Sequence, residues 1–286
     1  MSAHALLIEP FQSLAFMRTA LVACVALALT NGAIGTLLML RRMSLDGDVL
    51  GHAVMPGAAI GFLYAGPSPT WLSLGGLASG LGVAALAGLI AHGEARRDAE
   101  LVVFYLVAVS LGVVLVAWRG SNVDVVRVLF GTVLAIDRRA LLQIAAVTSV
   151  ILPAVAILYR PLAVGAFDPA FLRAVGVRAP YGAMFLLLVV LALIANFQAF
   201  GTLLAVGPML LPAAAARCWG LGAAATMVLS SGIGLAASLA GLLASYHANL
   251  PSGPVIILAA GALFAASLAA SCAWAHFAPL FGREEA

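Results

Sequence analysis

Asp48 and His52 are the residues of this sequence best suited to binding a metal ion. They are four residues apart at the start of an apolar segment. In an α-helix, a spacing of four places two side chains on the same face, one turn apart. A carboxylate oxygen and an imidazole nitrogen together suit Zn²⁺, Mn²⁺ or Fe²⁺. An interfacial aspartate and histidine at a helix start would show the same spacing, so both interpretations remain open at this point.

Two ligands make only half of a metal site. Asp46 adds a nearby carboxylate, and two copies of the pair around a dimer axis would supply four ligands. Pro56 and Gly57 follow in the same segment, where they could bend the helix and free backbone carbonyls towards a cavity. The segment is therefore a candidate for one wall of an ion pathway.

Three further polar residues are weaker candidates for lining such a pathway. Asn196 and Gln198 lie at a break between two apolar segments, where they either line a pathway or satisfy backbone groups. His247 lies beside Tyr246 near the end of another segment, and an aromatic-belt position explains it equally well. The three cysteines share no metal-ligand spacing, and packing is the favoured interpretation for them. No catalytic triad or nucleotide-binding loop is present in the sequence.

Charged residues are few and grouped, as in membrane proteins. Of the 286 residues, 64% are hydrophobic and 9% are charged, and the mean hydropathy is +1.14. A water-soluble fold could not bury this much apolar surface. The runs without any Asp, Glu, Lys or Arg are residues 19–40, 53–91, 101–118, 140–159, 179–216 and 218–282.

A helix needs about 20 apolar residues to cross the hydrocarbon core. Three of the runs fit one crossing, and three are long enough for two, with breaks at 66–69, 196–198 and 249–254. Continuous apolarity favours helices over a barrel. We predict an all-α polytopic protein, one domain over residues 1–286, with about nine crossings (eight to ten) that start near Thr19, Val49, Thr70, Leu101, Ala140, Pro180, Gly201, Leu221 and Gly253.

The arginines predict the orientation. Nine crossings place the termini on opposite sides, and an outside N-terminus puts nine of the fourteen basic residues, all arginines, on the cytoplasmic side. The pair Arg138-Arg139 then lies outside and counts against this orientation. The net charge of +3 is too weak and too dispersed to indicate nucleic-acid binding.

Two stretches between the membrane segments have helical signals of their own. Residues 120–137 are too short and too charged to cross, and they predict an interfacial or re-entrant helix. In residues 161–180, Asp168 occupies an N-cap position, Pro169 the first helical position, and Gly176 follows the last turn. Arg173 and Arg178 place this short helix on the cytoplasmic side. It is either a docking element or a connection that reverses the chain.

Motifs along nearly the whole chain resemble those of the permease subunits of ATP-binding-cassette (ABC) importers for zinc, manganese and iron. The first motif is RRMSLDGDVLGHAVMPG at residues 41–57, which includes Asp48 and His52. The chain departs from common family residues with Gly51 in place of Ser, Thr132 in place of Asn, and Leu211 in place of Thr. The other motifs are Ser121-Asn122-Val123-Asp124 with Leu129-Phe130-Gly131 and Leu134-Ala135, Phe167-Asp168-Pro169 with Gly176, Gln198-Ala199 with Gly201, Pro212-Ala213-Ala214 with Ala216-Arg217, and Ser252-Gly253-Pro254.

The resemblance implies a type II ABC importer permease in the bacterial inner membrane, with a periplasmic N-terminus and a cytoplasmic C-terminus. It implies a second copy of the chain, a cytoplasmic ABC ATPase subunit that binds ATP, and a periplasmic metal-binding protein as partners, besides the lipid bilayer. It also implies that no cofactor is bound permanently and that the chain itself is not an enzyme. Asp48 and His52 are then the transient metal contacts, and the loop at 161–180 carries the ATPase coupling helix, with Phe167, Asp168, Pro169, Arg173 and Gly176.

The resulting prediction is a permease for a divalent metal, with zinc first and manganese or iron next. Possible pathway residues besides the pair are Asp46, Asp124, Asn196, Gln198 and His247. A permease for a chelated metal such as a siderophore or cobalamin, an ATP-independent secondary metal transporter, and a membrane scaffold remain as alternatives. A secondary transporter would place ionisable residues in the middle of the membrane, and the long apolar runs contain none there.

Overall fold

The structure is a computed structural model that describes residues 9–66, 68–90, 107, 110–111, 114, 133–167, 181–201 and 204–281. Within these residues the regular structure consists of α-helices and one 3-10 helix, η1 (Val133–Ala135). The elements are α2 (Glu9–Ser13), α3 (Ala15–Leu40), α4 (Ser44–Ala65), α5 (Pro69–Ile90), α8 (Arg138–Phe167), α10 (Tyr181–Phe200), α11 (Gly207–Arg217), α12 (Ala223–Ala248) and α13 (Ser252–Phe281).

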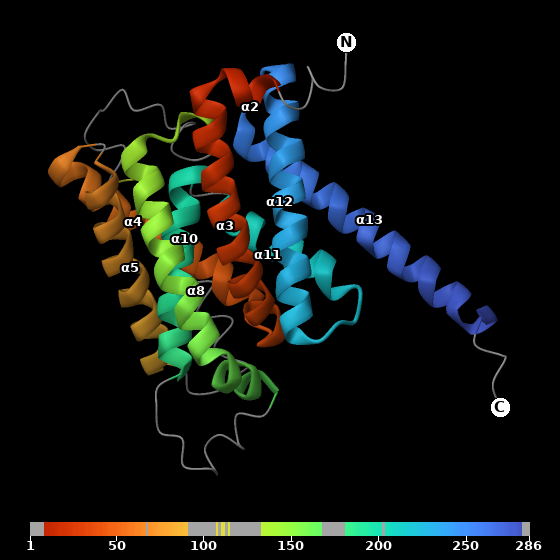
Figure 1. The fold of residues 1–286 in the computed structure, drawn as a ribbon. Helices are drawn as coiled ribbons and strands as arrows, with labels where there is room; N and C mark the ends of the chain where they lie inside the picture. The colour runs from red at the N-terminus through yellow and green to blue at the C-terminus, as the bar shows by residue number, and fades with distance from the viewer. Residues whose placement is uncertain are drawn as a thin grey trace.

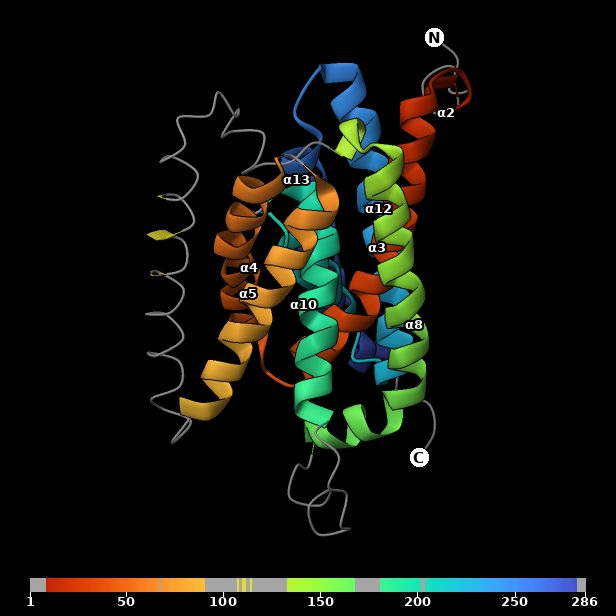
Figure 2. The same cartoon turned by 90° about the vertical axis from the view of Figure 1, so that its left-hand side faces the viewer.

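Helices α3 and α10 form the centre of the bundle. Helix α10 lies between α5 and α8 and also packs against α3 and α4 (Figure 2). Their shared core is aliphatic and includes Ile34, Leu37, Val189 and Leu193. Helix α13 starts beside the end of α12 and then runs away from the bundle (Figure 1), so its outer part is little buried. Helix α2 and the last turn of α13 lie towards opposite ends of the bundle (Figure 1).

The prediction of nine crossings is not confirmed. The described residues contain eight helices of seven residues or more, and six of them are long and apolar enough to cross a membrane. The segment expected from Gly201 contains only the 11-residue helix α11, too short for a crossing of about 20 residues. Helix α11 begins only at Gly207, after a turn at 204–206, and Pro208 lies in its first turn. The charge-free run of the sequence continues through this turn and therefore does not reveal it.

Glycine allows α4 and α5 to pack in direct backbone contact. A Cβ atom added at Gly57 would collide with the carbonyl oxygen of Gly75, and one added at Gly61 would collide with that of Trp71. Ser79 Oγ also donates a hydrogen bond to the Ala53 carbonyl. Close packing of small residues is the main source of helix association in a membrane, where helices gain little from leaving lipid. Gly57 thus serves packing, and Pro56 lies within a continuous helix.

The two stretches expected between membrane segments are described only in part. Of residues 120–137, the structure describes the last five, which include η1. Helix α8 continues through Pro161 to Phe167, so residues 161–167 are its final turns. The expected capped helix from Asp168 to Gly176 lies outside the described residues, as do Asp124 and Arg173.

Candidate metal pathway

The Asp48–His52 pair lies on one face of α4, as the spacing predicts. Asp48 Oδ1 is 3.7 Å from His52 Nε2, and the two residues are one turn apart. The His52 side chain is 9% exposed and the Asp48 side chain 55% exposed. The imidazole therefore lies in the protein, while the carboxylate reaches its surface. A cation at this edge would be held between a buried nitrogen and an accessible oxygen.

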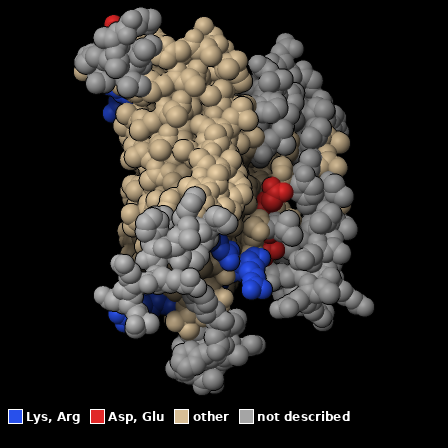
Figure 3. Space-filling model, turned by 90° about the vertical axis from the view of Figure 1, so that its right-hand side faces the viewer, with Lys and Arg blue, Asp and Glu red and all other residues tan. Residues whose placement is uncertain are grey.

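Asp46 lies two residues before Asp48, about half a helical turn away, and is buried, with 9% of its surface exposed. In the view of Figure 3, acidic side chains are few, and some of them lie close to basic side chains. Ionisable groups within membrane segments are costly and usually serve function. Asp46 and Asp48 thus place two carboxylates near the start of α4, shortly after Arg41 and Arg42 in the chain.

The sequence around the pair fixes α4 against its neighbours. A Cβ atom at Gly51 would lie 2.8 Å from Val206 Cγ2 and 3.6 Å from Leu193 Cδ2. The missing side chain lets α4 approach α10 and the turn before α11. A serine here would require Val206 to move, and the departure at position 51 thus has a packing consequence.

Arg41, in the turn before α4, ties this region to two other helices. Its Nη2 donates a hydrogen bond to the Leu162 carbonyl of α8 at 3.3 Å, and its Cζ lies 4.6 Å from the centre of the Phe185 ring of α10. Burial lowers the pKa of the Arg41 guanidinium, which still stays charged at neutral pH because arginine starts above 12. The following residue, Arg42, has a positive φ of 57° and closes the tight turn between α3 and α4.

The described residues contain no group of three or more His, Cys, Asp or Glu side chains that could hold a metal. The pair with Asp46 nearby is therefore an incomplete ligand set within the described part of one protomer. Metal sites in proteins usually have four ligands or more. A metal ion held by this pair would need further ligands from outside this set.

Three other predicted pathway residues, Asn196, Gln198 and His247, have contacts of their own in the structure. Asn196 is fully buried and exchanges two hydrogen bonds with Asn31 of α3, at 2.7 and 2.8 Å. Gln198 Nε2 donates to Ser73 Oγ at 2.7 Å and to Gln143 Oε1 at 2.9 Å. His247 is exposed near the end of α12, with its ring 5.2 Å from that of Tyr246. These contacts are with residues other than Asp48 and His52.

Sequence reasoning missed Asn31 and Gln143 as polar partners. Each is an amide side chain in an otherwise apolar run. A buried amide in a membrane helix needs a hydrogen-bond partner, so both were detectable as polar exceptions. Their partners were not detectable, because Asn31 and Asn196 are 165 residues apart.

Comparison with known proteins identifies the family. The sequence model of the family described as "ABC 3 transport family" matches residues 13–271. The chain belongs to the ABC 3 transport family. The resemblance to ABC importer permeases that the motifs indicate is thereby confirmed, and the polytopic helical fold agrees with it.

Similar permeases cover nearly the whole chain. The manganese import system permease protein ScaB of Streptococcus parasanguinis is 30% identical over 259 residues, 90% of this chain and 91% of that protein. The manganese transport system membrane protein MntC of Listeria monocytogenes is 30% identical over 261 residues, 91% of this chain and 92% of that protein. The solved structure of PsaBC from Streptococcus pneumoniae in complex with Fab has a TM-score of 0.83 and 29% identity, and the match covers 92% and 94% of the two chains.

Proposed function

We propose that this permease moves manganese into the cell as the membrane subunit of an ABC importer. The observation that carries the proposal is the Asp48–His52 pair, a carboxylate and an imidazole 3.7 Å apart at the protein surface within a membrane-spanning helix. A transported ion must be bound weakly enough to leave, which an incomplete ligand set allows. The names of the two similar permeases from Streptococcus parasanguinis and Listeria monocytogenes support manganese.

Manganese replaces zinc as the first choice. The residue types at the pair suit either metal, and the ranking of zinc first is not supported by the relatives, whose names specify manganese. No cysteine lies in α4, and a set of oxygen and imidazole ligands without thiolate fits a hard cation such as Mn²⁺. Iron and zinc are competitors that the experiment below measures together with manganese.

The second copy of the chain is proposed to complete the ligand set. Because Asp48 is exposed on the protomer surface, a two-fold axis beside α4 would bring two carboxylates and two imidazoles together. ATP hydrolysis on a separate cytoplasmic subunit would then move the helices, with the segment from Phe167 to Gly176 as its proposed contact. A periplasmic binding protein is proposed to deliver the ion.

The test measures cell manganese, zinc and iron by mass spectrometry under metal limitation. Cells that lack the gene are complemented with the wild type, His52→Ala, or Tyr64→Ala, which changes an 85% exposed residue of the same helix. We expect manganese alone to fall in the deletion, to recover with the wild type and Tyr64→Ala, and to stay low with His52→Ala. Immunoblots of membranes check that each variant is inserted.

Other results would point to other functions. If zinc or iron responds in place of manganese, the function stands and the metal is wrong. If no metal responds, a chelated cargo becomes the better candidate. If uptake continues when ATP synthesis is blocked but the proton gradient is kept, a secondary transporter replaces the ABC importer.

A further inference from the structure

A second polar region lies between α5, α8 and α10, well separated in sequence from the α4 pair. These helices line a cavity of about 210 Å³ that is open on one side. Its walls are hydrocarbon over most of their length, from Leu74, Leu77, Ala146, Val147, Leu191, Ile194 and Ala195. At one end the lining changes to four polar side chains, Thr70, Ser73, Gln143 and Gln198. We name this cavity the amide-capped pocket.

The polar end joins all three helices. Gln143 of α8 donates a hydrogen bond to Thr70 Oγ1 of α5 at 3.2 Å. Gln198 of α10 donates to Ser73 Oγ and to Gln143 Oε1, at 2.7 and 2.9 Å. Thr70 begins α5, Gln143 lies near the start of α8, and Gln198 near the end of α10. The polar end therefore lies at the membrane boundary and the hydrocarbon walls extend inward.

One acceptor at this polar end is left over. Gln198 Oε1 is buried and accepts no hydrogen bond from the described residues. Leaving a buried acceptor unsatisfied costs about 1–3 kcal/mol. A ligand that carries a hydroxyl or N–H group beside a hydrocarbon chain would satisfy this oxygen while its chain occupies the apolar walls.

The α8 helix adds positive charge directly beyond the polar end. Arg139 precedes Gln143 by four residues, so both lie on the same helical face, and Arg138 and Arg139 are exposed. Cations in the first turn of a helix are disfavoured by the helix dipole. In the orientation proposed from the arginines, this pair also violates the rule that basic residues stay inside. Asp137, whose Oδ1 accepts a hydrogen bond from the Ala140 N–H at 2.8 Å, supplies one negative charge here, and an anion beside Arg139 would supply another.

We propose that the amide-capped pocket binds one anionic glycerophospholipid of the surrounding bilayer. An acyl chain lies against Leu77, Val147 and Leu191, a headgroup hydroxyl donates to Gln198 Oε1, and the phosphate pairs with Arg139. The volume is about seven times the 30 Å³ that a water molecule occupies in the liquid, so it holds part of one chain. The rest of the lipid remains in the bilayer.

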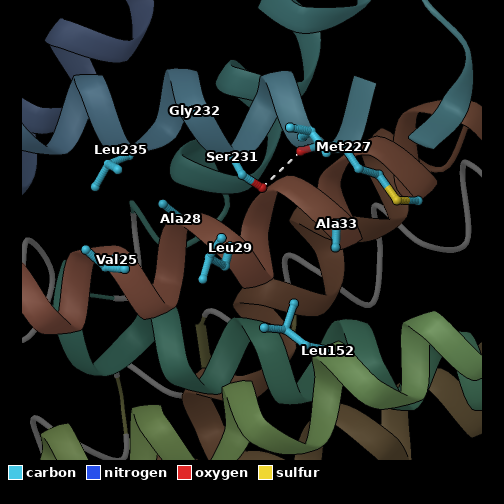
Figure 4. Close-up of a pocket in the computed structure, with 10 residues that line it drawn as sticks. Val25, Ala28, Leu29, Ala33, Leu152, Met227, Ser231, Gly232 and Leu235 are labelled. Atoms are coloured by element: carbon cyan, nitrogen blue, oxygen red, sulfur yellow. Dashed lines mark hydrogen bonds between the residues drawn. The ribbon is translucent and has the colours of Figure 1, made fainter. Parts of the chain in front are cut away.

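The position of the pocket favours lipid over a second copy of the chain. The helices that line the pocket, α5, α8 and α10, are turned to the viewer in Figure 2. The opposite side, in Figure 3, shows the acidic side chains near which the proposed dimer axis runs. By contrast, the larger cavity between α3, α8 and α12, of about 350 Å³ (Figure 4), is lined by apolar residues and Ser231. Ser231 donates to the Met227 carbonyl of its own helix at 2.9 Å, so that cavity has no polar end to select a headgroup.

Native mass spectrometry of the purified transporter tests the proposal. Delipidated protein is titrated with phosphatidylglycerol and, separately, with phosphatidylcholine of the same chains. For the wild type we expect one strongly retained phosphatidylglycerol per protomer and a clear preference over phosphatidylcholine. Arg139→Gln should reduce that preference about fivefold, the effect of one arginine near a charged lipid surface. Arg18→Gln, an exposed arginine at the same end of the bundle, should leave it unchanged.

A pair of tryptophan variants on α8 tests the pocket itself. Ala146→Trp fills the cavity and should abolish retention, whereas Leu142→Trp, at a 60% exposed position outside the lining, should not. Equal retention of phosphatidylglycerol by the two variants would overturn the proposal. Equal binding of phosphatidylglycerol and phosphatidylcholine to the wild type would also overturn it. Disulfide cross-linking of two protomers through Leu74→Cys would show that a second copy, and not lipid, covers this face.

Discussion

Two polar pairs inside the membrane helices contrast in charge and in accessibility. Asn31 and Asn196 are neutral, buried, and joined by two reciprocal hydrogen bonds of 2.7 and 2.8 Å. Asp48 and His52 are ionisable, 3.7 Å apart, and reach the surface through a carboxylate that is 55% exposed. The two amide side chains donate to and accept from each other, and this contact joins α3 to α10. The acidic pair instead has an exposed carboxylate, which a cation can reach.

The largest effect is expected from removing the negative charge at the open pair. Asp48→Asn keeps the size of the side chain and removes the charge that attracts the ion, so manganese uptake should fall by more than tenfold. Stability should change by less than about 0.5 kcal/mol, since exposed positions tolerate substitution. Uptake of radioactive manganese and thermal unfolding in detergent measure the two quantities. Glu9→Gln, at an exposed position, is the matched control. Normal uptake by Asp48→Asn would show that Asp48 is not a metal ligand.

Acidification should affect the acidic pair and leave the amide pair unchanged. Histidine ordinarily has a pKa of about 6.5, and the protonated ring is a cation without a lone pair for the metal. The neutral fraction falls as the pH drops through the range in which histidine titrates, so uptake should fall as the pH drops and return as it rises. Initial uptake rates in vesicles with matched inner and outer pH measure this dependence. Rates that stay constant down to about pH 5 would argue against His52 as a ligand.

Breaking the amide pair should reduce stability more than it reduces transport. Asn31→Leu leaves the buried Asn196 amide without its partner, which should destabilise the protein by about 1–2 kcal/mol. The double variant Asn31→Leu/Asn196→Leu should be more stable than the sum of the single changes predicts, because no amide is then left alone. Thermal unfolding of the four proteins in detergent gives this coupling. Additive effects would show that the two hydrogen bonds contribute little.

The smallest effect concerns the amide network at the end of the pocket. Gln143→Leu removes the hydrogen bond to Thr70 and an acceptor for Gln198 at a partly exposed site, for an expected loss of about 0.6 kcal/mol, the average for such bonds in a membrane protein. Manganese uptake should be unchanged, because the network lies apart from α4. The same unfolding and uptake assays apply, and an uptake loss as large as that of Asp48→Asn would place this network in the pathway.

Much of the site could be predicted from sequence because its geometry lies within one helix. Asp48 and His52 are four residues apart, and helical periodicity alone places them on a common face. Asn196 and Gln198 share one helix too, yet their roles as pathway residues stay a prediction, because each points to partners on other helices. The segment starts were predicted within two residues for α5, α8 and α13, which begin next to charge or proline. The end of α8 was not predicted, because this helix continues through Arg160 and Pro161 to Phe167. The segment from Gly201 was wrong in length, since hydropathy does not register the turn before α11.

By itself, the sequence determined that this is a helical membrane protein and which residues could hold a metal ion, because hydropathy, charge spacing and helical periodicity are local properties. Only the tertiary structure decided that His52 is buried while Asp48 reaches the surface, that Asn31 joins Asn196, and that Gln198 closes a pocket with Gln143. These facts depend on which helices pack together. Helix packing in turn depends on close backbone contacts, such as the contact of Gly57 with Gly75. Such contacts join residues whose distance along the chain follows no fixed spacing.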